Sequence, residues 1–389
     1  MTDHQRDLAQ TDFRTRAIHV GHGVDPTTGA VVPPIHMAST FRQPGAGTWG
    51  EFDYSRSGNP TRTNLETTLT SLESGAGSLA FASGMAAIHA VTMLLSAGDH
   101  VVAGSDLYGG AYRLLHKICD RSGIEVTLVD LTNHDAVRSA LRPQTKLLWG
   151  ETIGNPQLTI LDLRGLADLV SDHELIFGVD NTFGTPALLR PLEHGVDVVM
   201  HSATKYLGGH SDLLGGTLSV GDRDLYDRLY FVQNATGAVM DPMSCFLTSR
   251  GIKTLDVRVR EQSRTALELA SRLEKHPRIK RVLYPGLASH PQHALANKLF
   301  DSAFGGMVTF ELDASEAETA QVCERTRLFQ LAVSLGAVES LIEQPATMSH
   351  ASYDAADRAR FGVTDGLIRI SVGLESIDDL WQDLRSAIG

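Results

Sequence analysis

Short apolar runs alternate with amphipathic stretches between residues 61 and 250. Five of these runs have the length of strands and are apolar on both faces, which is typical of strands inside a sheet. They are HVVAG (100–104), IEVTLVD (124–130), KLLWG (146–150), LIFGVD (175–180) and VDVVM (196–200). Helix-like segments such as 109–121 and 162–173 fill several of the gaps. The pattern predicts a mainly parallel sheet covered by helices on both sides.

The two ends of the chain differ from this alternation. Residues 1–60 are rich in Gly, Pro and Thr, as in GVDPTTGAVVPP, and indicate an extended arm. After residue 250 the pattern indicates a loop (281–293), a strand (305–313), a helix, a strand (367–375) and a final helix (376–388). We therefore predict an arm over 1–60, a large domain over 61–250 and a smaller α+β domain over 251–389.

Polar residues follow three of the apolar runs. IFGVD ends at Asp180, VDVVM is followed by HSATK with Lys205, and KLLWG is followed by Glu151 and then by TIGNP with Asn155. In parallel sheets ligands bind beyond the carboxyl ends of the strands. An acid, a lysine with two neighbouring hydroxyls and an amide are therefore expected at one edge of the sheet.

A phosphate site is indicated upstream, in FASGMAAIHAVTMLL (81–95). Ser83-Gly84-Met85 stands at the start of a predicted helix, where free backbone N–H groups suit a phosphate and Gly84 allows close approach. A phosphate cradle, a lysine and a buried acid are the requirements of pyridoxal 5′-phosphate, whose aldehyde bonds to a lysine and whose ring nitrogen needs an acid.

Each of these residues also has an ordinary explanation when taken alone. Lys205 could form a surface ion pair, Asp180 could cap a helix, and Ser83-Gly84 could be a simple turn. Their joint placement at successive strand ends is what favours the cofactor.

Composition narrows the functional classes. The formal net charge of -12 argues against a nucleic-acid surface. Cys119, Cys245 and Cys323 stand far apart without a CxxC pair, which argues against a disulfide framework or zinc ribbon and fits a reducing cytoplasm. The polar start of the chain does not indicate a signal peptide. Residues 74–98 carry no charged side chain but are rich in Gly, Ala and Ser, so a loop leading into a buried helix is expected rather than a membrane span.

Seven segments between Ala17 and the C-terminus resemble, in order, motifs of the Cys/Met-metabolism family of pyridoxal-phosphate enzymes. They are YSRSGNPT (54–61), ASGMAAI (82–88), LYGG (107–110), VDNTF (179–183), HSATKYLGGHSD (201–212), YPGLASHPQH (284–293) and IRISVGLE (368–375). The family includes cystathionine γ-lyases, cystathionine γ-synthases and methionine γ-lyases. The resemblance implies fold type I, similar to aspartate aminotransferase. It also implies an amino-acid substrate, no nucleic-acid or membrane partner, and a homotetramer of dimers in which the arm reaches a neighbouring active site.

The resemblance also implies roles for the residues that match. Lys205 would bind the cofactor covalently and shuttle protons, Asp180 would pair with the ring nitrogen, and Tyr108 would stack on the ring and assist proton transfer. The residues implied to hold the phosphate are Gly84, Met85, Ser202 and Thr204, with Tyr54 and Arg56 from a neighbouring subunit.

Three further residues are implied to complete the site. Asn155 would contact the ring hydroxyl, and Arg369 would bind the substrate α-carboxylate through its planar guanidinium, with Ser334 nearby. Because an arginine inside an apolar strand needs a partner, a role without function explains Arg369 poorly. Arg56 could instead be a solvated arginine, and Tyr108 could belong to the core.

The residues at the positions expected to contact the substrate favour different substrates. Asp53 and Arg113 resemble charged residues of cystathionine enzymes and favour a charged leaving portion. Val333 stands where cystathionine γ-synthases and γ-lyases typically have Glu, and an apolar residue there is a trait of methionine γ-lyases. Those lyases, however, usually carry Cys where this chain has Gly110. Each position could also be ordinary, as a solvated charge or as core packing.

We expect a γ-lyase that converts L-cystathionine, and also L-methionine, to 2-oxobutanoate, ammonia and a thiol. The alternatives are cystathionine γ-synthase, which joins cysteine to an O-acylhomoserine, and methionine γ-lyase. The Trp-containing version of segment 332–340 found in β-lyases is absent from AVSLGAVES, so a β-lyase is less favoured.

Other classes match the sequence poorly. Ser202 and Lys205 fit the SxxK motif of penicillin-binding serine enzymes, but SDN and KTG are missing. GAGSLA (75–80) fits a dinucleotide fingerprint but lies ahead of the predicted helix start. His290 and His293 lack a third ligand, so no metal is expected. A non-catalytic protein on this fold would be expected to lose Lys205 or Asp180, and both are present.

Overall fold

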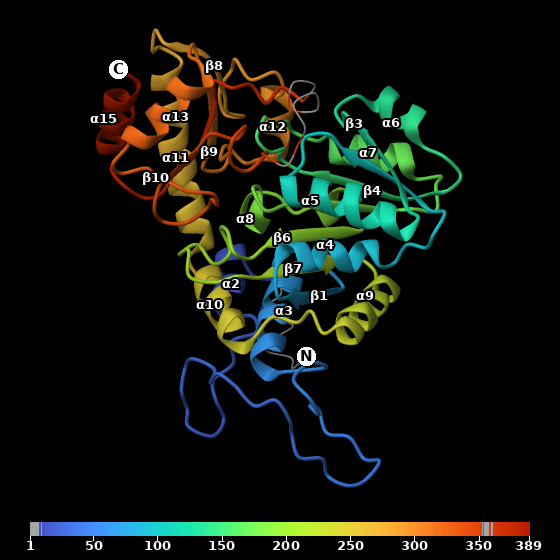
Figure 1. Cartoon of the computed structure of the whole chain (residues 1–389). Coiled ribbons are helices and arrows are strands. Elements are labelled where there is room, and N and C mark those ends of the chain that lie inside the picture. Colours follow the sequence, from blue (N-terminus) through green and yellow to red (C-terminus); the bar gives the residue numbers. More distant parts are fainter. Residues whose placement is uncertain (1–7, 9, 352, 354–357, 359–360) are drawn as a thin grey trace. The chain divides into compact units, whose positions relative to one another are not determined.

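The computed structural model describes residues 8, 10–351, 353, 358 and 361–389 (Figure 1). Residues 1–7 and 9, at the start of the predicted arm, lie outside the described residues. The contacts divide the chain into two compact units, Met1–Leu95 with Arg190–Asp256, and Ser96–Leu189 with Val257–Gly389. The predicted domain boundaries at 60 and 250 divide the chain differently and stay a prediction.

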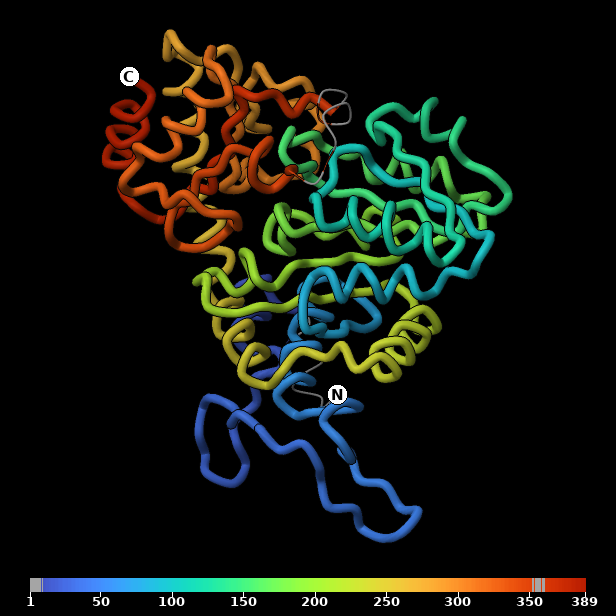
Figure 2. The backbone as a smooth tube through the Cα atoms, viewed as in Figure 1, coloured from blue at the N-terminus to red at the C-terminus, as the bar shows by residue number. Residues whose placement is uncertain are grey.

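The first unit begins with the arm, which contains the short helix α2 (Phe13–His19). Asp12 caps this helix by accepting the N–H of Arg14. From there to Asn59 the described chain forms no further helix, and only isolated bridges such as that between Thr40 and Tyr54 interrupt it. Figure 2 shows this segment in blue as long open loops. The extended character expected for the arm is therefore present from residue 20 to residue 59.

Helix α3 (Pro60–Leu72) starts where the arm ends. The side chain of Asn59 accepts the N–H groups of Thr61 and Arg62, and Pro60 suits the first turn because it has no N–H to satisfy. Arg62 in turn donates to the carbonyls of Ser55 at 2.7 Å and Arg56 at 3.1 Å. The end of the arm is thus tied to the first turn of α3.

Three buried strands form the core of the first unit. They are β1 (Gly77–Phe81), β6 (Val198–Ser202) and β7 (Gly216–Val220), with β7 antiparallel to both of the others. The predicted strand at 196–200 corresponds to β6. The remaining elements of this unit are α4 (Gly84–Thr92), η3 (Pro191–His194), α9 (Arg223–Thr236) and α10 (Pro242–Ile252).

Four parallel strands in the order β5-β4-β2-β3 open the second unit. Their bounds are β2 (His100–Gly104), β3 (Glu125–Val129), β4 (Thr145–Glu151) and β5 (Ile176–Asp180). The helices between them are α5 (Gly109–Arg113), η1 (Leu114–Cys119), η2 (Asp120–Ser122), α6 (His134–Ala140) and α7 (Leu163–Val170), and α8 (Thr185–Leu188) follows β5. These strands confirm the other four predicted runs. The helix expected over 109–121 is present but changes to π and 3-10 geometry after Arg113.

A second sheet of five strands, in the order β10-β11-β12-β9-β8, belongs to the second unit. Its strands are β8 (Ile279–Leu283), β9 (Met307–Leu312), β10 (Gln330–Leu331), β11 (Leu341–Glu343) and β12 (Leu367–Ser371). The accompanying helices are α11 (Leu255–Leu273), α12 (His293–Leu299), α13 (Glu316–Arg325) and α15 (Ile377–Ile388). The strands predicted over 305–313 and 367–375 and the final helix are confirmed. The expected loop over 281–293 was placed slightly wrongly, because β8 runs to Leu283 and α12 starts at His293.

No helix in the described part of the chain is long and apolar enough to cross a membrane. The uncharged segment 74–98 forms β1 and α4, so its apolar residues serve the core of the first unit.

A buried acid in α3 makes the stability of the fold depend on pH. Oε1 of Glu66 accepts the N–H of Ala80 at 2.9 Å, and Nε of Arg62 lies 3.6 Å from the same oxygen. Burial raises the pKa of Glu66 to about 7, and Arg62 and the Ala80 N–H only partly oppose this. Between the usual glutamate pKa and this value the folded state binds more protons than the unfolded state, so stability falls as pH rises.

We expect Glu66→Gln to flatten this dependence, because the amide keeps an acceptor for Ala80 and cannot ionise. We would follow thermal unfolding by circular dichroism from about pH 5 to about pH 8. The unfolding temperature of the variant should rise relative to that of the wild type as pH rises. Glu51→Gln, at an exposed position of the arm, is the control. Parallel curves for the wild type and Glu66→Gln would contradict the assignment.

Candidate active site

The start of α4 and the end of β6 meet in the first unit. Ser83 caps α4 by accepting the N–H of Ala86 at 3.1 Å. A Cβ on Gly84 would lie 3.1 Å from Cβ of Ser202 and 3.3 Å from its Oγ, tighter than most such contacts. The first backbone N–H groups of α4, including that of Met85, therefore stand next to the Ser202 hydroxyl. This combination suits a phosphate.

The turn after β6 carries the candidate lysine. The backbone N–H of Lys205 donates to the carbonyl of Ser202 at 3.1 Å, and its carbonyl accepts from Gly209 at 2.7 Å. Oγ1 of Thr204 donates to the carbonyl of Gly215 at 3.2 Å and accepts the N–H of the same residue at 3.0 Å. The turn is thus fixed by backbone contacts, and Lys205 is half-buried beside the end of β6.

Tyr54 and Arg56 lie in the exposed part of the arm. The Tyr54 ring is 46% exposed, and the guanidinium of Arg56 lies 5.5 Å from its centre. Nε of Arg56 also donates to Oδ1 of Asn234 at 3.4 Å. Oδ1 of Asp53 accepts the N–H of Tyr54 at 2.6 Å. These residues contact one another and, through Asn234, helix α9.

Two candidate acids occupy paired positions in the second unit. Glu151 ends β4 and Asp180 ends β5, and the two residues are register partners in this parallel pair. Oδ1 of Asp180 accepts the N–H of Thr182 at 2.8 Å. The strand-end prediction for this edge is therefore correct for both acids.

Arg369 lies on β12 inside a network of polar contacts. Its side chain is buried, with Nη1 donating to Oδ1 of Asn155 at 2.7 Å and Nη2 donating to the carbonyl of Ser334 at 3.1 Å. Nη2 also lies 3.1 Å from Oε1 of Glu343 on the neighbouring strand β11. The three residues that the resemblance grouped, Asn155, Ser334 and Arg369, are thus brought together. Glu343 was missed, although a buried arginine signals that some acid must accompany it.

Tyr108 stands at the beginning of α5. Its ring is 42% exposed, and its backbone N–H donates to Oε1 of Glu151 at 2.5 Å. Arg113, at the end of the same helix, is exposed, and Val333 is 59% exposed after β10. Gly110 is buried within α5. The substrate-related positions Arg113 and Val333 are therefore placed on surfaces of the second unit and not in its core.

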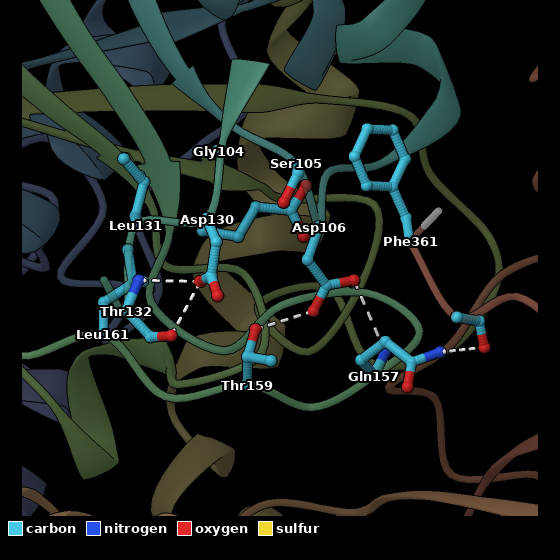
Figure 3. A pocket seen from close by; sticks show the side chains of 12 residues that line it. Gly104, Ser105, Asp106, Asp130, Leu131, Thr132, Gln157, Thr159, Leu161 and Phe361 are labelled. Atoms are coloured by element: carbon cyan, nitrogen blue, oxygen red, sulfur yellow. Dashed lines mark hydrogen bonds between the residues drawn. The ribbon is translucent and has the colours of Figure 1, made fainter. Parts of the chain in front are cut away.

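An acidic cavity of about 380 Å³ adjoins these strand ends (Figure 3). Oδ2 of Asp106 accepts the hydroxyl of Thr159 at 2.7 Å, and Asp130 accepts both the N–H and the hydroxyl of Thr132. Burial raises the pKa of Asp106 to about 6, although the bonds from Thr159 and Gln157 lower it. Asp106 and Asp130 follow two of the predicted strands, so the strand-end rule applied to every run would have found them.

Burial also shifts two further groups of the second unit. It raises the pKa of Glu151 well above the usual value, and Asp180 adds to this effect. Burial and the positive charge of Arg369 lower the pKa of His350 to about 4, so this histidine is neutral at physiological pH. His350 shares Asn155 with Arg369, because its Nε2 lies 2.9 Å from the Asn155 carbonyl oxygen.

The histidines of HPQH have local structural contacts. Nδ1 of His293 donates to the carbonyl of Pro285, and Nδ1 of His290 accepts the N–H of Gln292 at 3.2 Å. Among the described residues no group of three or more His, Cys, Asp or Glu side chains is placed to hold a metal ion.

Comparison with known proteins identifies the family. The family model described as Cys/Met metabolism PLP-dependent enzyme matches residues 14–389. A cystathionine beta-lyase from Coxiella burnetii is 50% identical over 376 residues, which cover 96% of this chain and 97% of that protein. A cystathionine gamma-lyase from Bacillus subtilis is 48% identical over 375 residues, covering 96% and 98%. The crystal structure of a cystathionine gamma synthase from Xanthomonas oryzae pv. oryzae has a TM-score of 0.94 at 42% identity, covering 97% and 98%. The chain belongs to the Cys/Met-metabolism family of pyridoxal-phosphate-dependent enzymes.

Membership of this family establishes pyridoxal 5′-phosphate as the cofactor and confirms the predicted fold class. The enzyme has an α/β fold with a large, mainly parallel sheet and a second, smaller sheet. Its own residues fit the cofactor. The first unit offers a helix start at Gly84, where a Cβ would be in tight contact with Ser202, and Lys205 follows Ser202 in the turn after β6. The second unit offers an acid at Asp180 and an exposed aromatic ring at Tyr108.

Gly84→Ala tests the phosphate cradle. The added methyl group would have to push Ser202 or α4 aside, which we expect to cost about 1–3 kcal/mol and to weaken cofactor binding roughly ten- to hundredfold. Affinity is measured by titrating apoenzyme with cofactor and recording visible absorbance. Gly23→Ala is the matched control, because a Cβ there meets no atom within 4 Å. Equal affinities for both variants would show that Gly84 does not lie at the phosphate.

Proposed function

We propose that the enzyme is a γ-lyase of sulfur amino acid metabolism that converts L-cystathionine to 2-oxobutanoate, ammonia and cysteine, and that also accepts L-methionine. Membership of a family of carbon–sulfur lyases and synthases limits the reaction to this group. Segment 332–340 favours γ- over β-cleavage, because it does not resemble the Trp-containing β-lyase version of this segment. The 48% identity to a cystathionine gamma-lyase agrees with this choice.

Two alternatives each have a specific observation in their favour. The relative at 50% identity is named cystathionine beta-lyase, which favours cleavage on the other side of sulfur. The structural neighbour with a TM-score of 0.94 is a cystathionine gamma synthase complexed with aminoacrylate and cysteine, which favours γ-replacement on an O-acylhomoserine. Identities of 50% and 48% do not separate these reactions, so the proposal depends on residues near the substrate.

The placement of Arg369 is the observation that supports an amino-acid substrate. Its guanidinium is buried, and the contacts to Asn155, Ser334 and Glu343 fix its plane before any substrate binds. A fixed planar guanidinium binds a carboxylate strongly and with little further loss of entropy. We assign the α-carboxylate of the substrate to this residue.

Pyridoxal 5′-phosphate, when bound, supplies an electron-withdrawing ring that stabilises negative charge at the substrate Cα. Nζ of Lys205 would take the proton from Cα and, for γ-cleavage, assist removal of a second proton from Cβ. Asp180 would hold the proton on the ring nitrogen. Tyr108 would cover the face of the ring and keep water from it.

The phosphate would be held by two groups of residues. Ser202, Thr204 and the backbone N–H groups of Gly84 and Met85 form the first group. Tyr54 and Arg56 form the second, supplied by a neighbouring subunit of a homotetramer. The exposed apolar side chains of the arm support this assembly, since Val31 and Trp49 are 78% and 72% exposed in the single chain.

Product analysis on L-cystathionine tests the reaction. We expect 2-oxobutanoate and cysteine, identified by chromatography after incubation with the cofactor-loaded enzyme. Pyruvate and homocysteine would identify a β-lyase and overturn the proposal. Cystathionine made from an O-acylhomoserine and cysteine, without cleavage, would identify a synthase. Lys205→Ala should lose turnover of every substrate while keeping its circular dichroism spectrum, and Lys280→Ala, a surface lysine paired with Asp313, is the control.

Val333→Glu tests the distal part of the substrate pocket. A carboxylate at this position would attract the distal ammonium of cystathionine but not the methyl group of methionine. Because the site is 59% exposed, we expect only about a two- to fivefold rise in the ratio of kcat/KM for cystathionine to that for methionine. Val257→Glu, at a position 62% exposed on α11, is the matched control. An unchanged ratio would remove Val333 from the pocket.

A further inference from the structure

Glu151 faces the same side of its sheet as Asp180. The two residues are register partners at the ends of the parallel strands β4 and β5. Paired residues of neighbouring strands lie about 4.8 Å apart and point to the same face. Two carboxyl groups therefore share one edge of the sheet, and only one of them, Asp180, has a role in the proposed function.

Glu151 also holds the backbone of Tyr108. Its Oε1 accepts the Tyr108 N–H at 2.5 Å, and the Tyr108 side chain makes no capping bond to α5. The preceding residue is held separately, because the hydroxyl of Tyr353 donates to the carbonyl of Leu107 at 2.9 Å. Tyr108 is 42% exposed, so its side chain is packed on only part of its surface. The bond to Glu151 holds the backbone N–H of Tyr108, and the Tyr108 carbonyl accepts the N–H of Tyr112 at 3.1 Å.

The surroundings of Glu151 disfavour its charged form. The side chain is buried, and the acids Asp180 and Asp106 face it, all of which raise its pKa. The Tyr108 N–H and Arg369 lower the pKa of Glu151, but each has a smaller effect than burial or Asp180. The charge of Arg369 is already matched by Glu343 at 3.1 Å. Two carboxylates at paired positions ionise together only at a cost in free energy, which adds to the effect of burial on Glu151.

The surroundings of Asp180 differ from those of Glu151. It is only half-buried, and its Oδ1 accepts the N–H of Thr182 at 2.8 Å, which stabilises a negative charge. Glu151 remains able to exchange its proton with water, because it lines the cavity of about 380 Å³ that also contains Asp106 and Asp130 (Figure 3).

We propose that Glu151 is a positioning residue that works in its uncharged form. It fixes Tyr108 through the backbone N–H and adds no second negative charge directly beside Asp180. The inference rests on the proposed function, in which Tyr108 and Asp180 contact the cofactor. It assigns no reaction step to Glu151 itself.

Substitution by an isosteric uncharged residue tests this role. Glu151→Gln keeps the acceptor for the Tyr108 N–H and is permanently uncharged, so we expect kcat near neutral pH within about threefold of the wild type. Glu151→Ala removes the acceptor and should lower kcat about a hundredfold, since small displacements of positioned groups have effects of that size. We expect the wild type to show an alkaline transition in the visible spectrum of the bound cofactor, and Glu151→Gln to lack it.

The outcomes separate the role of Glu151 from the identity of the reaction. If Glu151→Gln is as impaired as Glu151→Ala, the residue works as an anion and the proposal fails. It also fails if Glu151→Ala equals the wild type. If Glu151→Ala does not retain cofactor, the alkaline transition decides, and its persistence in Glu151→Gln overturns the proposal. Asp130→Asn, which lines the same cavity and contacts Thr132, is the control. Rates are followed on whichever substrate the wild type cleaves, so a wrong reaction assignment leaves this test intact.

Discussion

A buried positive charge organises the second unit of this enzyme. The guanidinium of Arg369 lies inside a sheet, where an unpaired charge would be very costly, and Glu343 on the neighbouring strand compensates it. Such a pair adds little net stability, because both ions lose their hydration. The pair instead fixes the orientation of the guanidinium, because Asn155 and the Ser334 carbonyl complete the set of contacts around it.

The charge of Arg369 also affects the pKa values of two other residues, His350 and Glu151. It helps to keep His350 neutral, and it lowers the pKa of Glu151 less than burial and Asp180 raise it. The acids of this edge therefore differ in their environment although they are chemically alike. Pairs of titratable groups whose surroundings drive their pKa values apart are typical of acid–base sites. In the first unit, by contrast, the site is built from backbone, through the close approach of Gly84 to Ser202.

The sequence predicted those elements that are determined by the pattern of neighbouring residues. Runs that are apolar on both faces located β2, β3, β4, β5 and β6, and the strand-end rule then pointed to Asp180 and Lys205. Strands β1 and β7 were missed because GSLAF and GTLSV are short and mix serine and glycine with apolar residues. Their buried serines are satisfied only across the strands, where the hydroxyls of Ser78 and Ser219 lie 2.7 Å apart. A single strand carries no sign of such a partner.

Long-range pairing limits the prediction of the site in the same way. A buried arginine requires an acid, but nothing local identifies Glu343 among the many glutamates of the chain. Glu151 was noticed as a strand-end residue, yet its contact with Tyr108 depends on a loop that returns from another strand. The strand-end rule was also applied to too few runs, which is why Asp106 and Asp130 were not selected.

The choice of reaction is the part of the function that the buried residues cannot decide. Under the proposed function, β-cleavage, γ-cleavage and γ-replacement would each use Arg369, Lys205 and Asp180, so these residues do not distinguish the reactions. Relatives named for β- and γ-cleavage are accordingly almost equally similar to this chain. Selectivity must then come from side chains that contact only the distal part of the substrate, and the candidates here, Val333 and Arg113, are exposed. Exposed positions tolerate substitution with little effect on stability, so closely related chains can differ in the reaction they favour.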